Sequence, residues 1–362
     1  MTLRIDLTGT PTERIRFAVS PLAELTAMLH VLAAPDHHPR LTGWAAGVRT
    51  ALRPELAERL HEAEFLWRSS RADFLVPARP RATLAEELDD VDLIDDDRYA
   101  HSALVTTCGS NRLHFAGRSP LRDPGARAEA LGRAQARGAA QEAFAERLLT
   151  DPAVVRARVR ETLEQCAEAF FDAAWPATAA RLAEDARDKG ELLRRHGLGA
   201  AMTAVSGAVG VGPDGRSLVL DKLQDNTAEA GPAGVTFLPT LYGHPHLVAV
   251  HATGWQPVVQ YPAARDGHHP DPVPLETVRL RLDALAHPVR LRLVRSLARG
   301  PHTTGELARS WDLTDPEVSR HLAVLRRAGL LTARRQGRYV HYTLDLAATT
   351  TLGTDLLAAV LR

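Results

Sequence analysis

Three adjacent polar residues near the C-terminus, Ser319, Arg320 and His321, have side chains that can contact nucleic-acid bases. An arginine can donate two hydrogen bonds at once to the O6 and N7 atoms of guanine, while serine and histidine can contact base edges or phosphates. Arg320 is therefore the residue expected to discriminate between base pairs. This chemistry requires a rigid element that fits the major groove, and an α-helix is such an element.

The residues around this triplet predict a helix that would carry it. Thr314 fits the N-cap, Pro316 lies in the first turn and Glu317 completes a capping box. Gly329 suits the left-handed residue that follows a helix end. Apolar residues recur at i, i+4 and i+7 and predict one buried face: Val318, Leu322 and Leu325. The alternative interpretation is an amphipathic surface helix whose arginines are merely solvated.

A shorter helical stretch at residues 303–311 precedes this helix, and residues 312–314 form a turn between the two. Two helices joined in this way predict a helix-turn-helix, whose second helix enters the major groove with its first two turns. The residues expected to contact DNA lie at the start and on the exposed face of that helix. They are Thr314, Glu317, Ser319, Arg320, His321 and Arg326.

An arginine-rich hairpin is predicted just after the second helix. Residues 331–335 and 338–344 form its strands, and Gly337 between them can adopt the positive φ that a tight turn needs. One strand alternates in the manner of a half-buried strand, with Val340, Tyr342 and Leu344 facing inward. Cations at the tip suit phosphates or a minor groove, and a solvated turn is the alternative. These cations are Arg334, Arg335 and Arg338.

Charge is distributed unevenly along the chain. The whole sequence has 44 basic and 44 acidic residues, but residues 275–362 contain 14 arginines and 8 acidic residues. This region therefore carries a charge of +6, and the other 274 residues carry −6. A basic module attached to an acidic remainder is the pattern expected of a DNA-binding domain joined to a domain with another role.

Several segments of the basic region resemble the ArsR (arsenic-repressor) winged-helix family. The matching segments read LAHPVRLRL, GELA, VSRHL and LRRAGL and begin at residues 285, 305, 318 and 325. The resemblance implies a homodimeric transcription regulator that binds double-stranded DNA, commonly a repressor released by an effector. It also implies dimer contacts through the flanking helices at residues 275–286 and 351–361. An apolar stripe fits that role, or else packs within its own chain: Leu352, Leu356 and Val360.

The sequence departs from the metal-sensing members of that family. Those members carry a Glu-Leu-Cys-x-Cys pattern in the first helix of the motif, whereas residues 305–309 here read GELAR. A metal site needs several ligands that converge on the ion. The histidines of this region occupy unrelated positions: His287, His302, His321 and His341. We therefore expect no metal and no cofactor, and a histidine and carboxylate site at a dimer interface is the alternative.

Length and composition bound the remaining possibilities. A chain of 362 residues with 45% apolar residues is expected to hold two or three domains with real cores. No apolar run approaches the roughly 18 residues of a membrane span, and the N-terminus lacks the apolar core of a signal peptide. Cys108 and Cys166 cannot form a disulfide framework and are expected to be small buried residues. We therefore expect a cytoplasmic protein with no membrane contact.

The first 205 residues are mostly helical by pattern. Helices are expected to begin at Ser20-Pro21, Pro54 and Asp151-Pro152, the last ending near residue 175, with another over residues 177–196. Short strands are possible at residues 5–7 and 14–18. An acidic run at residues 86–97 contains eight carboxylates. It could bind a divalent cation or compete with DNA for the basic module, but a solvated, mobile segment is the favoured interpretation.

Residues 206–262 have the character of strands. Strands are predicted at residues 209–211, 217–220, 235–238, 247–250 and 258–261. Histidines stand out here and just beyond, but no spacing among them matches a recognisable metal site: His244, His246, His251, His268 and His269. Residues 263–274 are rich in Pro, Gly, Asp and His and read as a linker.

The fold class predicted from these patterns is mainly α with α+β parts. Residues 1–205 would form a helical N-terminal domain, with the strand-rich segment 206–262 packed against it. The linker 263–274 would lead to a winged helix-turn-helix at residues 275–362. The helical region with the segments RIRF and SPL, which begin at residues 14 and 20, is followed by a strand-rich segment that ends with QYP at residues 260–262. This arrangement resembles an uncharacterised domain that precedes ArsR-like modules in many actinobacterial regulators, and that resemblance brings no ligand with it.

The function expected is that of a DNA-binding regulator with an N-terminal effector or dimerisation domain, whose small-molecule or protein effector the sequence does not identify. The alternative is a DNA-binding protein that recruits a partner and senses no small molecule. We find no nucleophile elbow, phosphate loop, HExxH pair or paired cysteine motif. The glycines at residues 207–212 lead to a turn, whereas a dinucleotide site needs a helix there. An enzyme is therefore not expected.

Overall fold

Two compact units make up the chain. The computed structural model describes residues 2–68, 71–109, 115–222, 226–252, 254–263, 273–336 and 339–361. The N-terminal unit spans residues 1–269 and the C-terminal unit spans residues 270–361. Most of the expected linker, residues 264–272, lies outside the described residues. The mainly α fold with α+β parts is confirmed.

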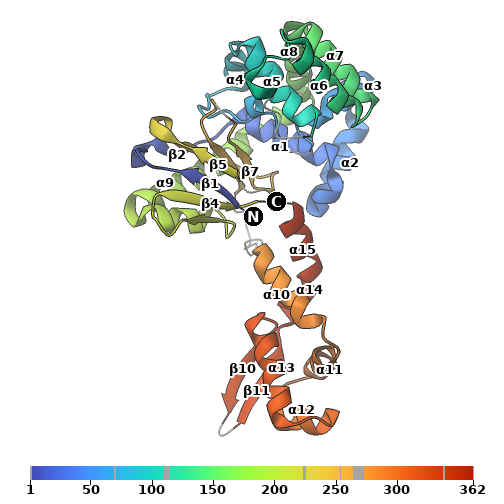
Figure 1. Ribbon diagram of the computed structural model, residues 1–362, viewed down its shortest axis with the longest axis vertical. Coiled ribbons are helices and arrows are strands. Elements are labelled where there is room, and N and C mark those ends of the chain that lie inside the picture. The colour runs from blue at the N-terminus through green and yellow to red at the C-terminus, as the bar shows by residue number, and fades with distance from the viewer. Residues whose placement is uncertain are drawn as a thin grey trace. The chain divides into compact units, whose positions relative to one another are not determined.

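A buried helix lies within the N-terminal unit. Helix α1, Pro21–Ala33, begins as the sequence predicts, with the Ser20 hydroxyl accepting a hydrogen bond from the amide of Ala23. All residues from Pro21 to Leu32 are buried, so neighbours cover the helix on every side. The other helices of this part of the unit (Figure 1) are α2 (Thr42–Ala51), α3 (Pro54–Ala63), α4 (Leu84–Asp92), α5 (Asp96–Thr107), α6 (Pro124–Gln135), α7 (Ala139–Thr150) and α8 (Pro152–Cys166).

The acidic run at residues 86–97 is mostly helical, and most of its carboxylates are exposed. Its interpretation as solvated is therefore confirmed, whereas the expectation of a mobile segment without regular structure is wrong. The run forms most of α4 and the start of α5, and each of these helices has an N-cap side chain that accepts a backbone hydrogen bond. Glu87 is only 1% exposed and accepts hydrogen bonds from the Ser20 hydroxyl at 2.9 Å and the Leu22 amide at 2.7 Å. Carboxylates near helix N-termini also interact favourably with the helix dipole. The run is therefore ordered by capping and by burial of one of its members.

Helix α8 is shorter than the sequence predicts. It ends at Cys166, continues as a π-helical turn over Ala167–Phe171, and is followed by a separate helix α9, Trp175–Val205. Helix α9 changes direction at Gly197, whose φ of 78° suits a residue without a Cβ. Cys108 and Cys166 are both free and buried, as predicted.

Two four-stranded sheets complete the N-terminal unit. Their strand orders are β3-β4-β1-β5 and β2-β6-β8-β7. The first strands of the chain, β1 (Thr2–Asp6) and β2 (Ile15–Phe17), pair with β4 and β5 and with β6 respectively, so residues 2–17 belong to the same sheets as the later strands. One hydrophobic core is shared by both sheets and α9. The later strands are β3 (Val209–Val211), β4 (Ser217–Asp221), β5 (Asn226–Glu229), β6 (Val235–Thr240), β7 (Val248–Val250) and β8 (Val258–Pro262).

The C-terminal unit has its own core and a three-stranded sheet of order β10-β11-β9. Helices α10 and α15 lie side by side at one end of it (Figure 1) and are joined by an ion pair between Arg281 and Asp355 at 2.8 Å. None of the described helices in either unit is long and apolar enough to cross a bilayer. The elements are α10 (Leu275–Leu285), α11 (Pro288–Leu297), β9 (His302–Thr303), α12 (Thr304–Trp311), α13 (Asp315–Arg327), β10 (Leu331–Gln336), β11 (Tyr339–Leu344), α14 (Leu346–Thr350) and α15 (Leu352–Leu361).

Candidate nucleic-acid interface

Helices α12 and α13 form the helix-turn-helix that the sequence predicts. The turn between them contains Asp312, whose φ of 54° is left-handed, and the Leu313 amide donates back to the carbonyl of Ala308 at 3.0 Å. Both helices begin with complete capping boxes, Thr303 with Glu306 and Thr314 with Glu317. The turn and the caps fix where α12 ends and where α13 begins.

The buried face of α13 is the predicted one. Val318, Leu322 and Leu325 have no exposed surface and belong to the core of the C-terminal unit. Ser319, Arg320 and Arg326 are exposed on the rest of the helix. Because the apolar contacts hold one face of α13 against its own unit, these polar side chains are left facing solvent.

His321 differs from its neighbours because it is only partly exposed. Its ring lies 4.8 Å from that of His287, measured between ring centroids. Burial lowers the pKa of His321, and the charges of His287 and Arg290 lower it further. A neutral imidazole presents one donor and one acceptor nitrogen.

Thr314 and Glu317 are engaged in the cap of α13. The Thr314 amide donates to the Glu317 carboxylate at 3.2 Å and the Thr314 hydroxyl does so at 3.0 Å, while the Glu317 amide donates to that hydroxyl at 3.4 Å. These hydrogen bonds hold the pKa of Glu317 below its usual range, so the carboxylate stays charged. The sequence correctly predicts the cap, and the cap orients the first turn of the helix.

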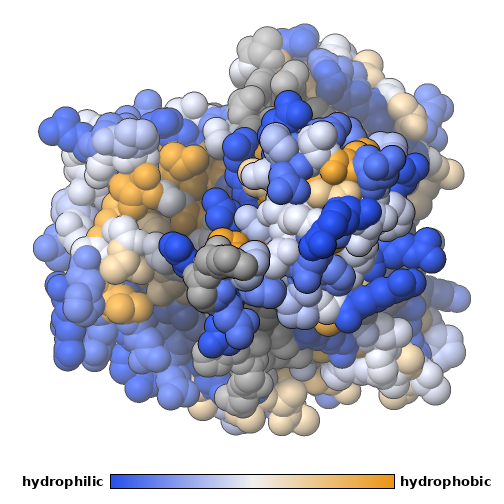
Figure 2. Space-filling model, turned by 90° about the horizontal axis from the view of Figure 1, so that it is seen from below, coloured by the Kyte–Doolittle hydropathy of each residue, from blue (hydrophilic) through white to orange (hydrophobic). Residues whose placement is uncertain are grey.

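The hairpin of β10 and β11 forms the predicted wing. The strands pair antiparallel, with Arg334 opposite His341 and Arg335 opposite Val340. Arg334 and Arg335 are exposed. Hydrophilic residues cover much of the face of the protein seen in Figure 2. Gly337 and Arg338 lie outside the described residues. The prediction that Val340 faces inward is wrong: it is 38% exposed, because the wing extends beyond the core and only Leu344, at its base, is buried.

Two supporting features have no counterpart among the sequence predictions. Arg281 and Asp355 are 12% and 16% exposed in their side chains, so their ion pair is largely removed from solvent. The indole of Trp311 donates to the hydroxyl of Ser296 at 3.0 Å and so ties α12 to α11. Nothing in the spacing of these residues signals the contacts, because each pair is brought together only by packing.

Comparison with known proteins separates the two units. A family model described as a family of unknown function, DUF5937, matches residues 1–267.

The chain belongs to the DUF5937 family.

A helix-turn-helix domain model matches residues 285–334 of this DUF5937 protein, the segment that contains α12 and α13. The C-terminal unit is therefore a winged helix-turn-helix attached to the DUF5937 region, and the resemblance to ArsR-family regulators is confirmed.

Three curated relatives each match a fifth of this chain or less. The biofilm growth-associated repressor of Agrobacterium fabrum is 42% identical over 67 residues, which are 18% of this chain and 57% of the relative. An HTH-type transcriptional regulator of Mycobacterium tuberculosis is 44% identical over 73 residues, or 20% of this chain and 68% of the relative. The arsenical resistance operon repressor of Escherichia coli is 44% identical over 62 residues, 17% and 53% of the two chains. The chain thus spans little more than half the length of some of these relatives.

Among solved structures, that of the transcriptional repressor BigR from Xylella fastidiosa is 35% identical, with a TM-score of 0.20. The match covers 22% of this chain and 82% of that one.

Proposed function

We propose that this protein is a sequence-specific transcription regulator that binds double-stranded DNA as a homodimer, most simply as a repressor. The observation that carries the proposal is the exposed Ser319 and Arg320 pair on the free face of α13, the second helix of the helix-turn-helix. Major-groove recognition requires polar side chains near the start of that helix. The names of the curated relatives, which are repressors and transcriptional regulators, support the same assignment.

The proposed contacts divide by their chemistry. Arg320 would take a guanine, and Ser319 and His321 would contact neighbouring bases or phosphates. Arg326 and the wing would bind phosphates, which fix the register of the protein without reading sequence. The wing residues are Arg334, Arg335 and Arg338. Thr314 and Glu317 would border the groove and act chiefly through the cap that they form.

The homodimer would use α10 and α15. Leu282 on α10 is 41% exposed, and Leu357 and Val360 on α15 are 42% and 49% exposed. Leu352 and Leu356 of the predicted stripe are partly buried, so the stripe is divided between packing within the chain and solvent. Covering these exposed leucines and Val360 with a second copy would remove apolar surface from water.

The N-terminal unit would be the effector or dimerisation domain, with residues 1–205 and the strand-rich segment 206–262 acting together and residues 263–274 linking them to residues 275–362. A groove of about 350 Å³ lies in this unit between α3, α7 and α8. Its apolar wall includes Phe144 and Val159, and charged residues at its edge include Arg59 and Arg158. An apolar pocket with few polar groups is the usual form of a small-molecule site. We ascribe no catalytic activity to the chain.

The test is selection of genomic DNA fragments by the purified full-length protein. We expect enrichment of an inverted repeat whose half-sites lie about one helical turn, roughly 10 base pairs, apart. A control selection uses the double variant Arg334→Ala, Arg335→Ala. It should bind all DNA more weakly, and its salt dependence should be shallower by about one unit of slope for each phosphate that the variant no longer binds.

The outcomes separate the parts of the proposal. Enrichment of one asymmetric site would argue against a symmetric dimer, and enrichment of no sequence, both with and without added cell extract, would refute sequence-specific regulation. If the salt dependence of DNA binding has the same slope in the double variant as in the wild type, Arg334 and Arg335 do not contact phosphates. If the wild type enriches no site but acquires one when cell extract is added, an effector or partner is required for DNA binding.

A further inference from the structure

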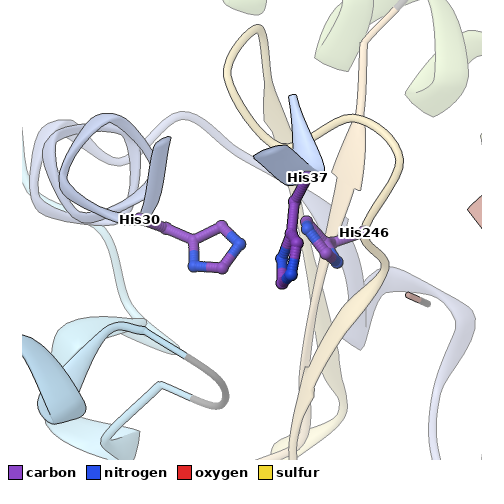
Figure 3. A group of neighbouring side chains, drawn as sticks. All are labelled: His30, His37 and His246. Atoms are coloured by element: carbon purple, nitrogen blue, oxygen red, sulfur yellow. The ribbon is translucent and has the colours of Figure 1, made fainter. Parts of the chain in front are cut away.

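Three histidines from distant parts of the sequence meet inside the N-terminal unit. His30 lies on α1, His37 on the short 3-10 turn Pro35–His37 that follows it, and His246 on the segment between β6 and β7. One ring nitrogen from each lies within 4.8 Å of the other two. In Figure 3 the ring of His30 points from α1 toward the other two rings, which lie next to each other. The ring centroids of His30 and His246 are 4.6 Å apart.

The hydrogen bonds of His30 leave one of its nitrogens available as a ligand. Its Nδ1 atom lies 3.0 Å from the carbonyl oxygen of Trp67. A carbonyl oxygen can only accept, so Nδ1 carries the proton and Nε2 keeps a lone pair. That Nε2 atom is buried and has no hydrogen-bond partner among the described residues. Metal-binding histidines characteristically donate their other N–H to a carbonyl or carboxylate in this way.

His38 repeats the arrangement beside the group. Its Nδ1 atom donates to the carbonyl oxygen of His244 at 2.7 Å, and its Nε2 atom is buried without a partner among the described residues. His38 is 3% exposed and His30 is 5% exposed. The ring centroid of His38 lies 5.0 Å from that of His30 and 5.1 Å from that of His246. A buried nitrogen without a partner costs free energy, which a bound ligand at that atom would offset.

The surroundings keep these imidazoles in the form that binds metal. Burial lowers the pKa of His38 to about 4, and it lowers the pKa of His30 even further. The charge of Arg71 contributes to both shifts and would also oppose a bound cation. Glu24 supplies the opposite charge to Arg71. Both shifts favour the neutral imidazole, which is the form that binds a metal ion.

We propose that His30, His37 and His246 bind a divalent late transition-metal ion of the Zn²⁺ class, with His38 beside them as a fourth ligand or as a support. Imidazole suits Zn²⁺, Cu²⁺ and Ni²⁺, whereas Mg²⁺ and Ca²⁺ prefer oxygen ligands. Three histidines and one further position match a four-coordinate zinc site. Zinc–nitrogen bonds of about 2.0–2.1 Å require ligand nitrogens about 3.3 Å apart, so the rings must move inward by about 1 Å on binding.

The proposed site is independent of the DNA-binding proposal. All four histidines lie in the N-terminal unit, and the site contains no residue of the winged helix-turn-helix. It also differs from the cysteine site that metal-sensing ArsR-family members carry in the first helix of the helix-turn-helix, because the proposed ligands here are all imidazoles. Metal binding can be measured without DNA, so failure of one proposal leaves the other standing.

The experiment loads the metal-free full-length protein with Zn²⁺ and separately with Co²⁺. We expect one Zn²⁺ per chain in competition with a chromophoric chelator. Co²⁺ should give the intense visible absorption of a four-coordinate site. X-ray absorption of the Zn²⁺-loaded wild type should show at least three imidazole nitrogens at about 2.0–2.1 Å. A spectrum of oxygen ligands alone, or no binding at stoichiometric protein, would overturn the proposal.

Two variants and a matched control assign the ligands. His37→Gln and His246→Gln should each weaken Zn²⁺ binding by at least about 100-fold, since loss even of an outer partner of a ligand costs about 10- to 100-fold. His61→Gln makes the same change at a side chain that is 76% exposed and lies outside the group, and it should bind Zn²⁺ like the wild type. Equal affinity in all three variants would overturn the proposal. If a variant fails to fold, the X-ray absorption spectrum of the Zn²⁺-loaded wild type still tests the proposal.

Discussion

The two units differ in where their most informative charged groups lie. In the N-terminal unit several are buried: Glu87 is 1% exposed, Arg71 is 7% exposed, and the Asp185 carboxylate accepts a hydrogen bond from the buried Tyr261 hydroxyl at 2.7 Å. In the C-terminal unit Arg320 and Arg334 are exposed, whereas Arg281 and Asp355 are largely removed from solvent. Buried charged groups form hydrogen bonds and ion pairs that hold a unit together, whereas exposed charged groups can bind a partner molecule.

The units also differ in how far apart in sequence their contacts lie. The Glu24 carboxylate accepts from the Leu241 amide, 217 positions later, and the Gln260 side chain donates to the carbonyl of Ala23, 237 positions away. In the C-terminal unit α12, α13 and the wing follow one another, and each capping box joins two residues that are three positions apart. We therefore expect the two units to respond differently to mutation, pH and salt.

The largest expected effect is on the stability of the C-terminal unit, and it tests whether the two units unfold separately. Leu322→Ala deletes a fully buried side chain from the core of the C-terminal unit. It should lower the free energy of unfolding of that unit by about 2–5 kcal/mol. Calorimetry should show one transition moving to lower temperature while a second transition, that of the N-terminal unit, stays in place. A single transition that shifts as a whole would mean that the units unfold together.

The next effect concerns DNA recognition. Arg320→Ala should cost about 1–3 kcal/mol in binding to the selected operator, because the variant cannot form the bidentate hydrogen bonds to guanine. Binding to unrelated DNA should change much less, and titrations with both DNAs give the ratio. Arg279→Ala is the matched control, since Arg279 is exposed but pairs with Glu276 and Asp283 on α10. An equal loss on both DNAs would make Arg320 a phosphate contact.

The sequence predicts the C-terminal unit well because its signals are local. Caps, the turn and the apolar period of α13 depend on residues within about one or two helical turns of each other. The prediction that Val340 faces inward is wrong, because the alternation of residues along a strand shows which of them share a face but not whether the core extends to that point of the strand. The exposure of Arg320 and Arg334 follows from the same local pattern.

The sequence predicts helix starts in the N-terminal unit but not what its polar residues do. Ser20 and Asp151 are recognisable caps. Nothing near the acidic run in sequence reveals that one of its members, Glu87, is buried and accepts hydrogen bonds from Ser20 and Leu22. The histidine group is missed for the same reason: His246 stands out in the sequence, but its neighbours His30 and His37 come from the opposite end of the unit. The sequence feature that could have indicated this group is the pair of adjacent histidines, His37 and His38, in a short segment between two prolines.

A smaller effect should appear in the pH dependence of the N-terminal unit. Burial raises the pKa of Glu87 to about 7, although Leu22, Arg81 and Ser20 donate hydrogen bonds to it. The folded state therefore keeps a proton that the unfolded state has released. The stabilisation linked to this proton is fully present below about pH 4.5 and is lost as the pH rises toward 7.

The change is at most about 1.4 kcal/mol for each pH unit. Urea unfolding of the wild type and of Glu87→Gln between pH 4.5 and 7.5 measures it, since the amide does not titrate. The wild type should lose more stability than the variant as the pH rises through this range. Parallel pH profiles would show that the Glu87 carboxyl has the same pKa in the folded and unfolded states.

The smallest expected effect decides between two roles of Thr314. Thr314→Ala removes the hydroxyl that caps α13 and should lower the stability of the C-terminal unit by about 1 kcal/mol. Thr303→Ala removes the same kind of capping box from α12 and should have a similar cost. If Thr314 acts only through its cap, the two variants should also keep similar affinity for the operator once both are fully folded. A loss of operator affinity confined to Thr314→Ala would instead mean that this hydroxyl, at the start of the recognition helix, contacts DNA directly.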